Sequence, residues 1–279
     1  MFPVLAMGHL IPLCEFAKRL VLAHNFSVTF IVPNDGPLST APKLFLDSLI
    51  PVGINYVLLP SVNVDELSND VVSAGSRISL AASHSLPSLH DVLKSLVSSS
   101  RVVALVVDLM ATDAFDVTAE FNLSPYAFFA STAMLLSFIL DIPKLDESVS
   151  CEHRKLLEPV KIPGGTLVHG KDILLDLVQD RKSDSYKRLL NYGKRYRLVE
   201  GIMVNSFKEL EGGDVKALQE EEPGKPPVYP IGPLIRMGGV DNGSDCLRWL
   251  DDQPYGSVFP TLVVLRVKRY SSSLWNIQI

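Results

Sequence analysis

The sequence predicts an α/β protein whose mostly parallel sheet carries helices on both faces. Three observations support this prediction. Short runs of β-branched and other apolar residues, such as residues 102–107, alternate along the chain with segments of helical periodicity. Several of these runs are apolar at almost every position, which is typical of strands buried on both faces. Hydrophobic residues make up 47% of the 279 residues, enough to build one large domain or two small ones.

The amino-terminal residues predict a strand, a tight turn and a helix. A short apolar run over residues 2–6 ends just before Gly8, and a helical pattern begins directly after His9. Pro12 suits the first turn of that helix, because a proline there gives up no intrahelical hydrogen bond. His9 is therefore expected at the carboxyl end of a strand, where open α/β sheets bind their ligands. The expected buried face of the helix consists of Leu13, Phe16, Ala17, Leu20 and Val21.

Strands and helices continue to alternate as far as residue 140. The predicted strands are apolar runs, of which residues 27–32 and 102–107 are rich in β-branched side chains, and the helix predicted at residues 78–97 carries an apolar stripe. The polar residues 61–76 are expected to form a loop. The strands are expected at residues 27–32, 54–59, 102–107 and 125–129. The helices are expected at residues 41–49, 78–97, 112–121 (with Thr112 as its cap) and 131–140.

Beyond Asp141 the pattern is less regular. Residues 142–171 are richer in Pro, Gly and charge, which predicts a long excursion from the sheet. A charged helix is expected next, and residues 238–244 resemble a linker. The further elements are expected at residues 180–200 (helix), 201–205 (strand), 215–222 (helix), 228–234 (extended) and 246–252 (helix).

Charge and cysteine content argue against several classes of function. The net charge of -5, with no basic cluster, argues against nucleic acid and anionic membrane as partners. Cys14, Cys151 and Cys246 have no paired spacing, so we expect a reduced compartment, no metal site and no bound cofactor. The longest apolar stretch, residues 126–140, is shorter than the ~20 residues of a membrane-spanning helix. Residues 1–3 lack the basic region of a signal peptide, and together these two observations predict a cytoplasmic protein. We also expect a monomer.

His9 and Asp108 are the candidate catalytic pair. Asp108 ends an otherwise apolar strand and His9 follows another, so both should lie at the same edge of the sheet. A carboxylate there would hold the imidazole in one tautomer and stabilise it once protonated. The helix amino terminus is expected to depress the pKa of His9 and to favour the proton-accepting form. Structural roles are the alternatives, with His9 as a helix cap or core residue and Asp108 as a turn cap.

The sequence contains no nucleophile motif to accompany this pair. G-x-S-x-G, G-x-G-x-x-G and G-x-x-x-x-G-K-[ST] are all absent, and Cys14 falls inside the first predicted helix. An unrelated dinucleotide-binding enzyme would need a glycine-rich phosphate loop of this kind. A base without a protein nucleophile indicates that His9 activates a hydroxyl group of the substrate.

An ordered series of motifs resembles the UDP-dependent glycosyltransferases of plant secondary metabolism. It begins with Met7-Gly8-His9-Leu10-Ile11-Pro12-Leu13, and it is most similar to the subgroup that glucosylates hydroquinone and other phenols. The further matches, in chain order, are Phe16-Ala17-Lys18-Arg19-Leu20, Val28-Thr29-Phe30, Val106-Val107-Asp108-Leu109, Asp113-Ala114-Phe115-Asp116, Gly201-Ile202-Met203-Val204-Asn205-Ser206-Phe207, Glu209-Leu210-Glu211, Pro227-Val228-Tyr229-Pro230-Ile231-Gly232-Pro233-Leu234 and Cys246-Leu247-Arg248-Trp249-Leu250-Asp251.

The resemblance implies the GT-B fold, in which two Rossmann-like domains face each other across a cleft. Residues 1–235 would form the amino-terminal, acceptor-binding domain. By resemblance, His9 removes the proton of the acceptor hydroxyl and Asp108 orients and charge-stabilises His9. The hydroxyl then attacks the anomeric carbon of UDP-glucose with inversion and without a required metal. Weaker acceptor-binding candidates, several of which would serve equally well in a core, are Met7, Gly8, Phe128, Phe129, Ser131 and Thr132.

The sequence departs from the family pattern at both ends. Residues 2–6 replace a fuller first strand, and the family's donor-binding motif with its His-Cys-Gly-Trp-Asn run is absent. We expect residues 236–258 to be a linker and the start of a missing carboxyl-terminal donor domain. Residues 259–279 are expected to be an aberrant tail, as a frameshift or a retained intron would produce. The expected protein is a truncated and inactive UDP-glucosyltransferase; the alternative is a non-catalytic acceptor-binding module or a partner of a full-length relative.

Overall fold

The computed structural model describes most of the first 235 residues and little of the rest. A compact unit extends over Met1–Arg236, and a second unit over Met237–Ile279. The expected linker, residues 236–258, and the expected tail, residues 259–279, therefore lie almost wholly outside the described residues. The described residues are 1–37, 40–66, 74–149, 151–152, 155–156, 158–169, 181–235, 249 and 252–253.

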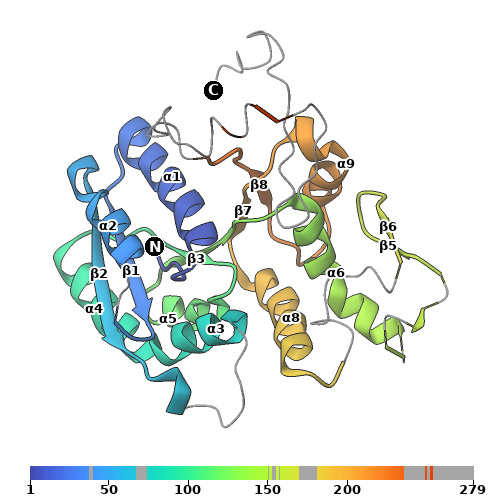
Figure 1. The fold of residues 1–279 in the computed structure, drawn as a ribbon, viewed down its shortest axis with the longest axis horizontal. Coiled ribbons are helices and arrows are strands. Elements are labelled where there is room, and N and C mark those ends of the chain that lie inside the picture. Colours follow the sequence, from blue (N-terminus) through green and yellow to red (C-terminus); the bar gives the residue numbers. More distant parts are fainter. Residues whose placement is uncertain are drawn as a thin grey trace. The chain divides into compact units, whose positions relative to one another are not determined.

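Parallel strands form the central sheet of the first unit (Figure 1). This arrangement is the mostly parallel sheet that the alternation of strands and helices predicts. One pair consists of β1 (Val28–Asn34) and β2 (Ile54–Ser61). A separate antiparallel pair consists of β5 (Val160–Lys161) and β6 (Leu167–Val168). The larger group has the order β3 (Ala104–Asp108), β4 (Ser124–Phe129), β7 (Gly201–Val204) and β8 (Val228–Pro230).

The first two residues join β1 to β3. The Ile31 N–H donates to the Met1 carbonyl at 2.8 Å, and the Phe2 N–H donates to the Val106 carbonyl at 2.8 Å. Phe2 pairs in parallel with Val107. The first predicted strand is thus present as a short bridge, which makes the two groups of strands one continuous sheet. Its brevity follows from the start of α1 (Met7–His24) so soon afterwards.

Three predicted helix starts are wrong. α1 begins at Met7, so His9 lies in the first turn of the helix instead of in a turn before it. Residues 78–97 form parts of two helices, because Pro87, which has no N–H to donate, favours a new helix start. Thr112 caps no helix; it begins a 3-10 turn that precedes α5 (Phe115–Glu120). The two helices that replace the single predicted one are α3 (Ala74–His84) and α4 (Leu86–Ser99).

The remaining helices differ from their predicted bounds mainly in length. The helix expected at residues 131–140 continues to Ser148, because Pro143 is accommodated inside it. The helix expected at residues 215–222 begins well before Val215. The observed bounds are α2 (Thr40–Asp47), α6 (Ala133–Ser148), α8 (Asp184–Arg195) and α9 (Lys208–Gln219).

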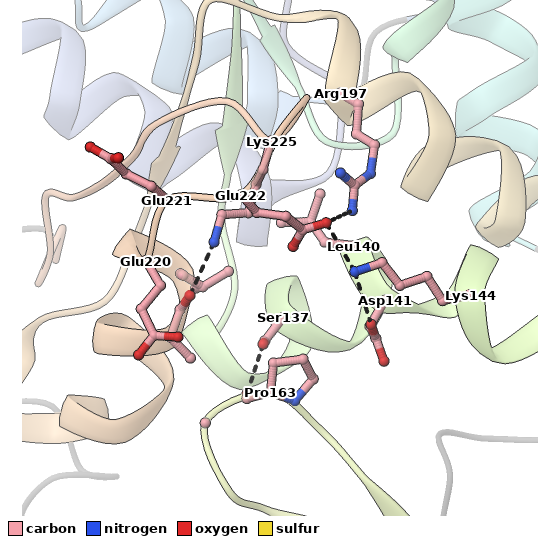
Figure 2. A pocket seen from close by; sticks show the side chains of 13 residues that line it. Ser137, Leu140, Asp141, Lys144, Pro163, Arg197, Glu220, Glu221, Glu222 and Lys225 are labelled. Carbon is pink, nitrogen blue, oxygen red and sulfur yellow. Dashed lines mark hydrogen bonds and ion pairs between the residues drawn. The ribbon is translucent and has the colours of Figure 1, made fainter.

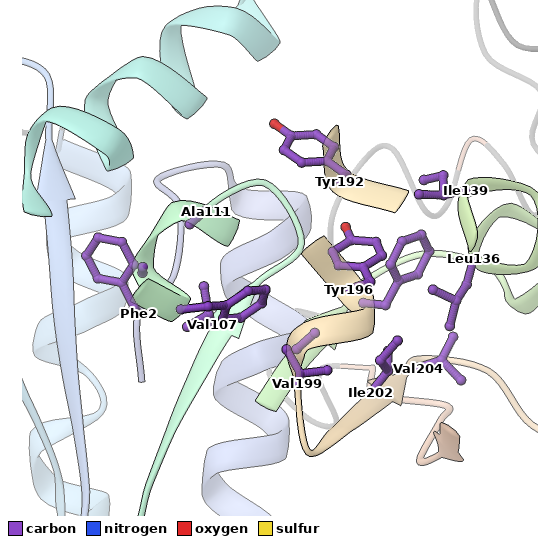
Figure 3. Packing of buried hydrophobic residues seen from close by; sticks show 14 of the residues in the cluster. Phe2, Val107, Ala111, Leu136, Ile139, Tyr192, Tyr196, Val199, Ile202 and Val204 are labelled. Carbon is purple, nitrogen blue, oxygen red and sulfur yellow. The ribbon is translucent and has the colours of Figure 1, made fainter. Parts of the chain in front are cut away.

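Helices cover both faces of the sheet, and each face has its own core. Along β3, Val106 belongs to the core under α1 and α2, whereas Leu105 and Val107 belong to the larger core on the opposite face. This alternation is the period of two that a strand imposes on its side chains. Helices α4, α5, α6, α8 and α9 all contribute to the larger core. Figure 3 shows part of it, including Phe2, Val107, Leu136, Tyr192, Tyr196 and Ile202.

Candidate functional site

His9 and Asp108 meet at the carboxyl edge of the sheet. His9 lies in the first turn of α1, and Asp108 is the last residue of β3. The His9 Nδ1 atom is 3.1 Å from both carboxylate oxygens of Asp108. Because Nδ1 faces the carboxylate, it carries the proton of the neutral ring, and Nε2 on the other side is the proton acceptor. The imidazole side chain is 24% exposed, so a ligand can reach it.

Asp108 determines the electrostatics of this pair. Its side chain is fully buried, and it also accepts the N–H of Met110 at Oδ1 at 3.0 Å. Burial by itself lowers the pKa of His9, but the hydrogen bond and the charge of Asp108 outweigh burial and raise that pKa above its ordinary value. The predicted depression of the His9 pKa is therefore wrong. A carboxylate in direct contact acts more strongly on the ring than the partial charge of a helix end.

Gly8 leaves open space beside the histidine. The residue is exposed, and a methyl group placed on its α-carbon would meet no heavy atom within 4 Å. Met7, on the other side of Gly8, is partly buried and packs against the core under α1. The first turn of α1 thus carries a partly exposed imidazole and, one residue earlier, a backbone with no side chain around it.

The two phenylalanines at the end of β4 are fully buried on opposite faces of the sheet. The Phe128 ring is stacked with Phe16 of α1 at a centroid distance of 6.1 Å. The Phe129 ring meets the edge of Tyr196, also at 6.1 Å, in the larger core. These are the positions of core residues, so the expected contact of Phe128 and Phe129 with an acceptor stays a prediction.

Ser131 and Thr132 lie in the connection from β4 to α6. Thr132 is exposed and is the N-cap of α6, where its hydroxyl oxygen accepts the N–H of Leu135 at 3.2 Å. Ser131 is partly buried. Both residues follow the carboxyl end of β4, which lies next to β3 and Asp108. Their expected contact with an acceptor stays a prediction.

Proteins of known activity resemble the chain over most of its length. The hydroquinone glucosyltransferase of Rauvolfia serpentina is 60% identical over 260 residues, which cover 92% of this chain and 55% of that protein. UDP-glycosyltransferase 72B1 of Arabidopsis thaliana is 53% identical over 261 residues, which cover 92% and 54%. No protein-family model matches the sequence.

Solved structures give the same result for the fold. A UDP-glucosyltransferase from Polygonum tinctorium capable of glucosylating indoxyl, solved with 3,4-dichloroaniline, matches with a TM-score of 0.83 and 53% identity, over 92% of this chain and 56% of that one. Phytolacca americana UGT2, complexed with UDP-2fluoro-glucose and pterostilbene, matches with a TM-score of 0.82 and 46% identity, over 92% and 57%. The chain is a homologue of the plant UDP-glycosyltransferases. It spans about half the length of the curated relatives that it matches.

The predicted fold class is confirmed for this glycosyltransferase homologue. The matching structures are GT-B glycosyltransferases, and the chain corresponds to roughly half of each. The order of the parallel strands places the ends of β1, β3, β4 and β7 at one edge, where His9 and Asp108 lie. The edge that binds ligands in open α/β sheets is therefore the edge that carries the pair.

Glu211 of the glycosyltransferase homologue has a structural role that no spacing in the sequence indicates. Its Oε2 atom accepts the N–H of Ala133 at 2.8 Å, and its Oε1 atom accepts the N–H of Met134 at 3.1 Å. The hydroxyl of Ser206 also donates to this carboxylate. Glu211 has non-helical φ and ψ values of -132° and 50°, so α9 bends there and turns the carboxylate toward α6. A carboxylate at a helix amino terminus satisfies free N–H groups and stabilises the helix dipole.

The Glu211→Gln variant is expected to unfold more easily. Glutamine keeps the size of the side chain but loses the charge that strengthens three hydrogen bonds, at a cost of about 1–3 kcal/mol. A loss of that size lowers the melting temperature by about 2–12 °C in a domain of this length. Thermal unfolding followed by circular dichroism measures the change. Glu209→Gln, an exposed change on the same turn, is the matched control, and equal melting temperatures for the two variants would contradict the role of Glu211.

Other reactive groups in the described part of the glycosyltransferase homologue do not form a second centre. Burial raises the pKa of the Cys14 thiol to about 12, against a smaller opposite influence of Lys18, so the thiol stays protonated at neutral pH. Among the described residues, no group of three or more His, Cys, Asp or Glu side chains is placed to hold a metal ion. Within the same residues, no helix is both long enough and apolar enough to cross a membrane.

A hollow lies beside α6, away from the His9–Asp108 pair (Figure 2). Its volume is about 340 Å³, and it is lined by residues of α6 and by segments that precede β7 and β8. Its charged side chains pair with one another. The Oε1 atom of Glu222 accepts hydrogen bonds from the Lys144 ammonium at 2.9 Å and from the Arg197 guanidinium at 3.2 Å. These contacts lower the pKa of Glu222, with Lys144 as the main cause. The ion pairs that line the hollow thus connect Lys144 of α6 with Arg197, before β7, and Glu222, before β8.

Proposed function

We propose that the chain forms the acceptor side of a UDP-dependent glucosyl transfer to the hydroxyl of a small phenol. One observation carries the proposal: a partly exposed histidine is held by a fully buried carboxylate at the ligand-binding edge of the sheet. Gly8, which precedes His9, is exposed and has no side chain, and the proposal places the phenol ring there. The homologous hydroquinone glucosyltransferase supports the choice of a phenol and of a glucosyl donor.

The proposed chemistry uses His9 as a general base. Its Nε2 atom accepts the proton of the acceptor hydroxyl, while Nδ1–H stays hydrogen-bonded to Asp108. The acceptor oxygen forms a bond to the anomeric carbon of UDP-glucose as the bond from that carbon to the phosphate oxygen breaks. UDP leaves with the electron pair from the opposite face, so the configuration inverts. Asp108 stabilises the imidazolium that results, and such general-base catalysis contributes about 10²- to 10⁴-fold.

The raised pKa of His9 suits this task. A phenolic hydroxyl of the tyrosine type has a pKa near about 10, so a more basic imidazole accepts its proton with less of an energetic deficit. The same shift means that transfer requires a pH high enough to leave His9 neutral. We therefore expect the rate to rise with pH through the raised His9 pKa. We further propose that residues 1–235 form the acceptor-binding domain and that the protein is a cytoplasmic monomer.

Calorimetric titration of the chain with hydroquinone and, separately, with UDP tests the proposal. We expect hydroquinone to bind and the His9→Gln variant to bind it more weakly, because one hydrogen bond is lost. His24→Gln, a change at the exposed end of the same helix, is the matched control and should leave the affinity unchanged. Failure of hydroquinone and other simple phenols to bind, or binding of UDP without any phenol, would contradict the proposal. Phenol binding without glucoside formation after addition of UDP-glucose would favour the non-catalytic acceptor-binding module.

The Gly8→Leu variant is expected to lose phenol binding without losing stability. A β-carbon at position 8 meets no heavy atom within 4 Å, and the longer leucine side chain would extend into the space proposed for the phenol. Leucine also favours a helix over glycine by up to about 1 kcal/mol. Calorimetry should show at least a tenfold weaker affinity, while the melting temperature stays equal or rises. Gly8→Ala adds a single methyl group and should have a smaller effect; unchanged phenol affinity in Gly8→Leu would place the acceptor elsewhere.

A further inference from the structure

A single peptide group connects the catalytic pair to a buried tyrosine. The N–H of Met110 donates to Oδ1 of Asp108 at 3.0 Å. The carbonyl of the same peptide group belongs to Leu109, and it accepts the hydroxyl of Tyr196 at 2.7 Å. The two hydrogen bonds therefore lie at opposite ends of one planar, rigid unit. With the contact between Asp108 and His9 they form a continuous chain from Tyr196 to the imidazole.

We propose that Tyr196 is a positioning residue for the His9–Asp108 pair and acts through the Leu109–Met110 peptide group. Its hydroxyl fixes the plane of that peptide and thereby the direction in which the Met110 N–H points. That N–H holds the Asp108 carboxylate with both of its oxygens at 3.1 Å from Nδ1 of His9. Hydrogen bonds in such a chain also polarise one another in a poorly solvated interior.

The surroundings of Tyr196 suit a fixed donor. The side chain is fully buried, and its ring is stacked with Tyr192 and meets the edge of Phe129. Burial raises the pKa of its hydroxyl well above the ordinary value, and Tyr192 and Asp108, the titratable groups that face it, raise that pKa further. The hydroxyl therefore remains protonated and donates at every pH at which the protein is active.

Tyr192 lies one helical turn before Tyr196, but its hydroxyl does not bond the carbonyl of Leu109. Its hydroxyl forms a hydrogen bond of 2.8 Å with the hydroxyl of Ser79. The same Tyr192 hydroxyl lies 3.4 Å from the carbonyl oxygen of Met110. Ser79 donates to that carbonyl at 3.0 Å, so Met110 keeps a close donor when Tyr192 loses its hydroxyl. The carbonyl of Met110 belongs to the next peptide group, which does not donate to the Asp108 side chain. The N–H of that group, on Ala111, donates to the backbone carbonyl of Asp108 at 3.0 Å. Of the two tyrosines, Tyr196 is thus the one that is linked through a peptide group to the Asp108 side chain.

Titration of His9 by nuclear magnetic resonance tests the inference in the full chain. The signal of His9 is assigned by its loss in His9→Gln. We expect Tyr196→Phe to lower the pKa of His9 and to move the Met110 amide proton upfield, whereas Tyr192→Phe leaves both unchanged. An unchanged His9 pKa in folded Tyr196→Phe, or equal shifts in the two variants, would overturn the inference. Should Tyr196→Phe not fold, 3-fluorotyrosine at position 196 strengthens the donor and should move the Met110 amide proton downfield; an unmoved signal would overturn the inference.

The effect on turnover rests on the proposed function. In a complete transferase, in which this chain is joined to a donor-binding domain, Tyr196→Phe should lower kcat about tenfold and change KM for the phenol by less than about twofold, because the base is displaced and the binding space is not. The titration of His9 needs no substrate, so it decides the role of Tyr196 by itself. A lowered His9 pKa in a chain that binds no phenol would contradict the proposed function and leave the positioning role standing.

Discussion

The Asp108→Asn variant is expected to move the pKa of His9 from above the ordinary histidine value to below it. Burial is the largest single influence on the ring and lowers its pKa; the hydrogen bond and charge of Asp108 oppose burial. An asparagine of the same shape keeps the burial and removes the charge. Titration of the His9 ring by nuclear magnetic resonance measures the reversal directly, without a substrate.

Transfer should fall steeply in the same variant. The imidazolium that forms during proton transfer loses its neighbouring negative charge, and asparagine also permits the wrong ring tautomer. In a complete transferase, in which this chain is joined to a donor-binding domain, we expect a loss of about 10²- to 10⁴-fold in kcat, measured as glucoside formed from UDP-glucose and hydroquinone. Asp116→Asn makes the same chemical change at an exposed carboxylate that pairs with Arg195. That control should keep both the His9 pKa and the rate; an Asp108→Asn enzyme that remained as fast would contradict the proposed base.

The stability that Asp108 contributes through His9 should also depend on pH. The pKa of His9 is higher in the folded chain than in the unfolded one, so the pair contributes stability fully below the unfolded value of about 6.5. This contribution is lost as the pH rises through the raised pKa of the folded chain. The difference in unfolding free energy between the parent chain and Asp108→Asn should therefore be larger at about pH 5.5 than at about pH 9.

Gly193→Ala is expected to cause the largest loss of stability from a single methyl group. Gly193 of α8 faces α6, and a methyl group on its α-carbon would lie 2.3 Å from the carbonyl oxygen of Ile139. That carbonyl lacks its usual partner within the helix, because Pro143, four residues later, has no N–H. The close approach of a backbone to this carbonyl is possible only where no side chain intervenes. We expect a cost of about 3 kcal/mol and a melting temperature lowered by about 6–12 °C.

Gly212→Ala is the matched control for this substitution. Gly212 also lies in a helix, α9, and a methyl group there would have no heavy atom within 4 Å. Alanine is the better helix former by up to about 1 kcal/mol, so this variant should be as stable as the parent or more so. Thermal and urea unfolding of the two variants provide the comparison. Similar melting temperatures for Gly193→Ala and the parent would show that α6 and α8 can separate at little cost.

Much of the first unit could be predicted from local sequence. The β-branched runs over β1 and β3 and the apolar end of β4 predict buried strands, and the apolar stripe of α1 predicts a helix with one buried face. Local pattern was less useful at helix starts. The apolar stripe is continuous across α3 and α4 and by itself favours one helix. Pro87 is the residue that marks the start of the second helix.

The sequence by itself determined the sheet, the carboxyl-edge position of His9 and Asp108, and the motifs shared with plant UDP-glycosyltransferases, because strand periodicity and residue type are local properties. Only the tertiary structure decided the hydrogen bonds of Glu211 and Tyr196. Each acts on a backbone group 78 or 87 residues away, and hydrogen bonds of that range have no period or spacing in the sequence. The direction of the His9 pKa was likewise decided by tertiary contact, because burial and a carboxylate at 3.1 Å compete there and only their geometry sets which prevails.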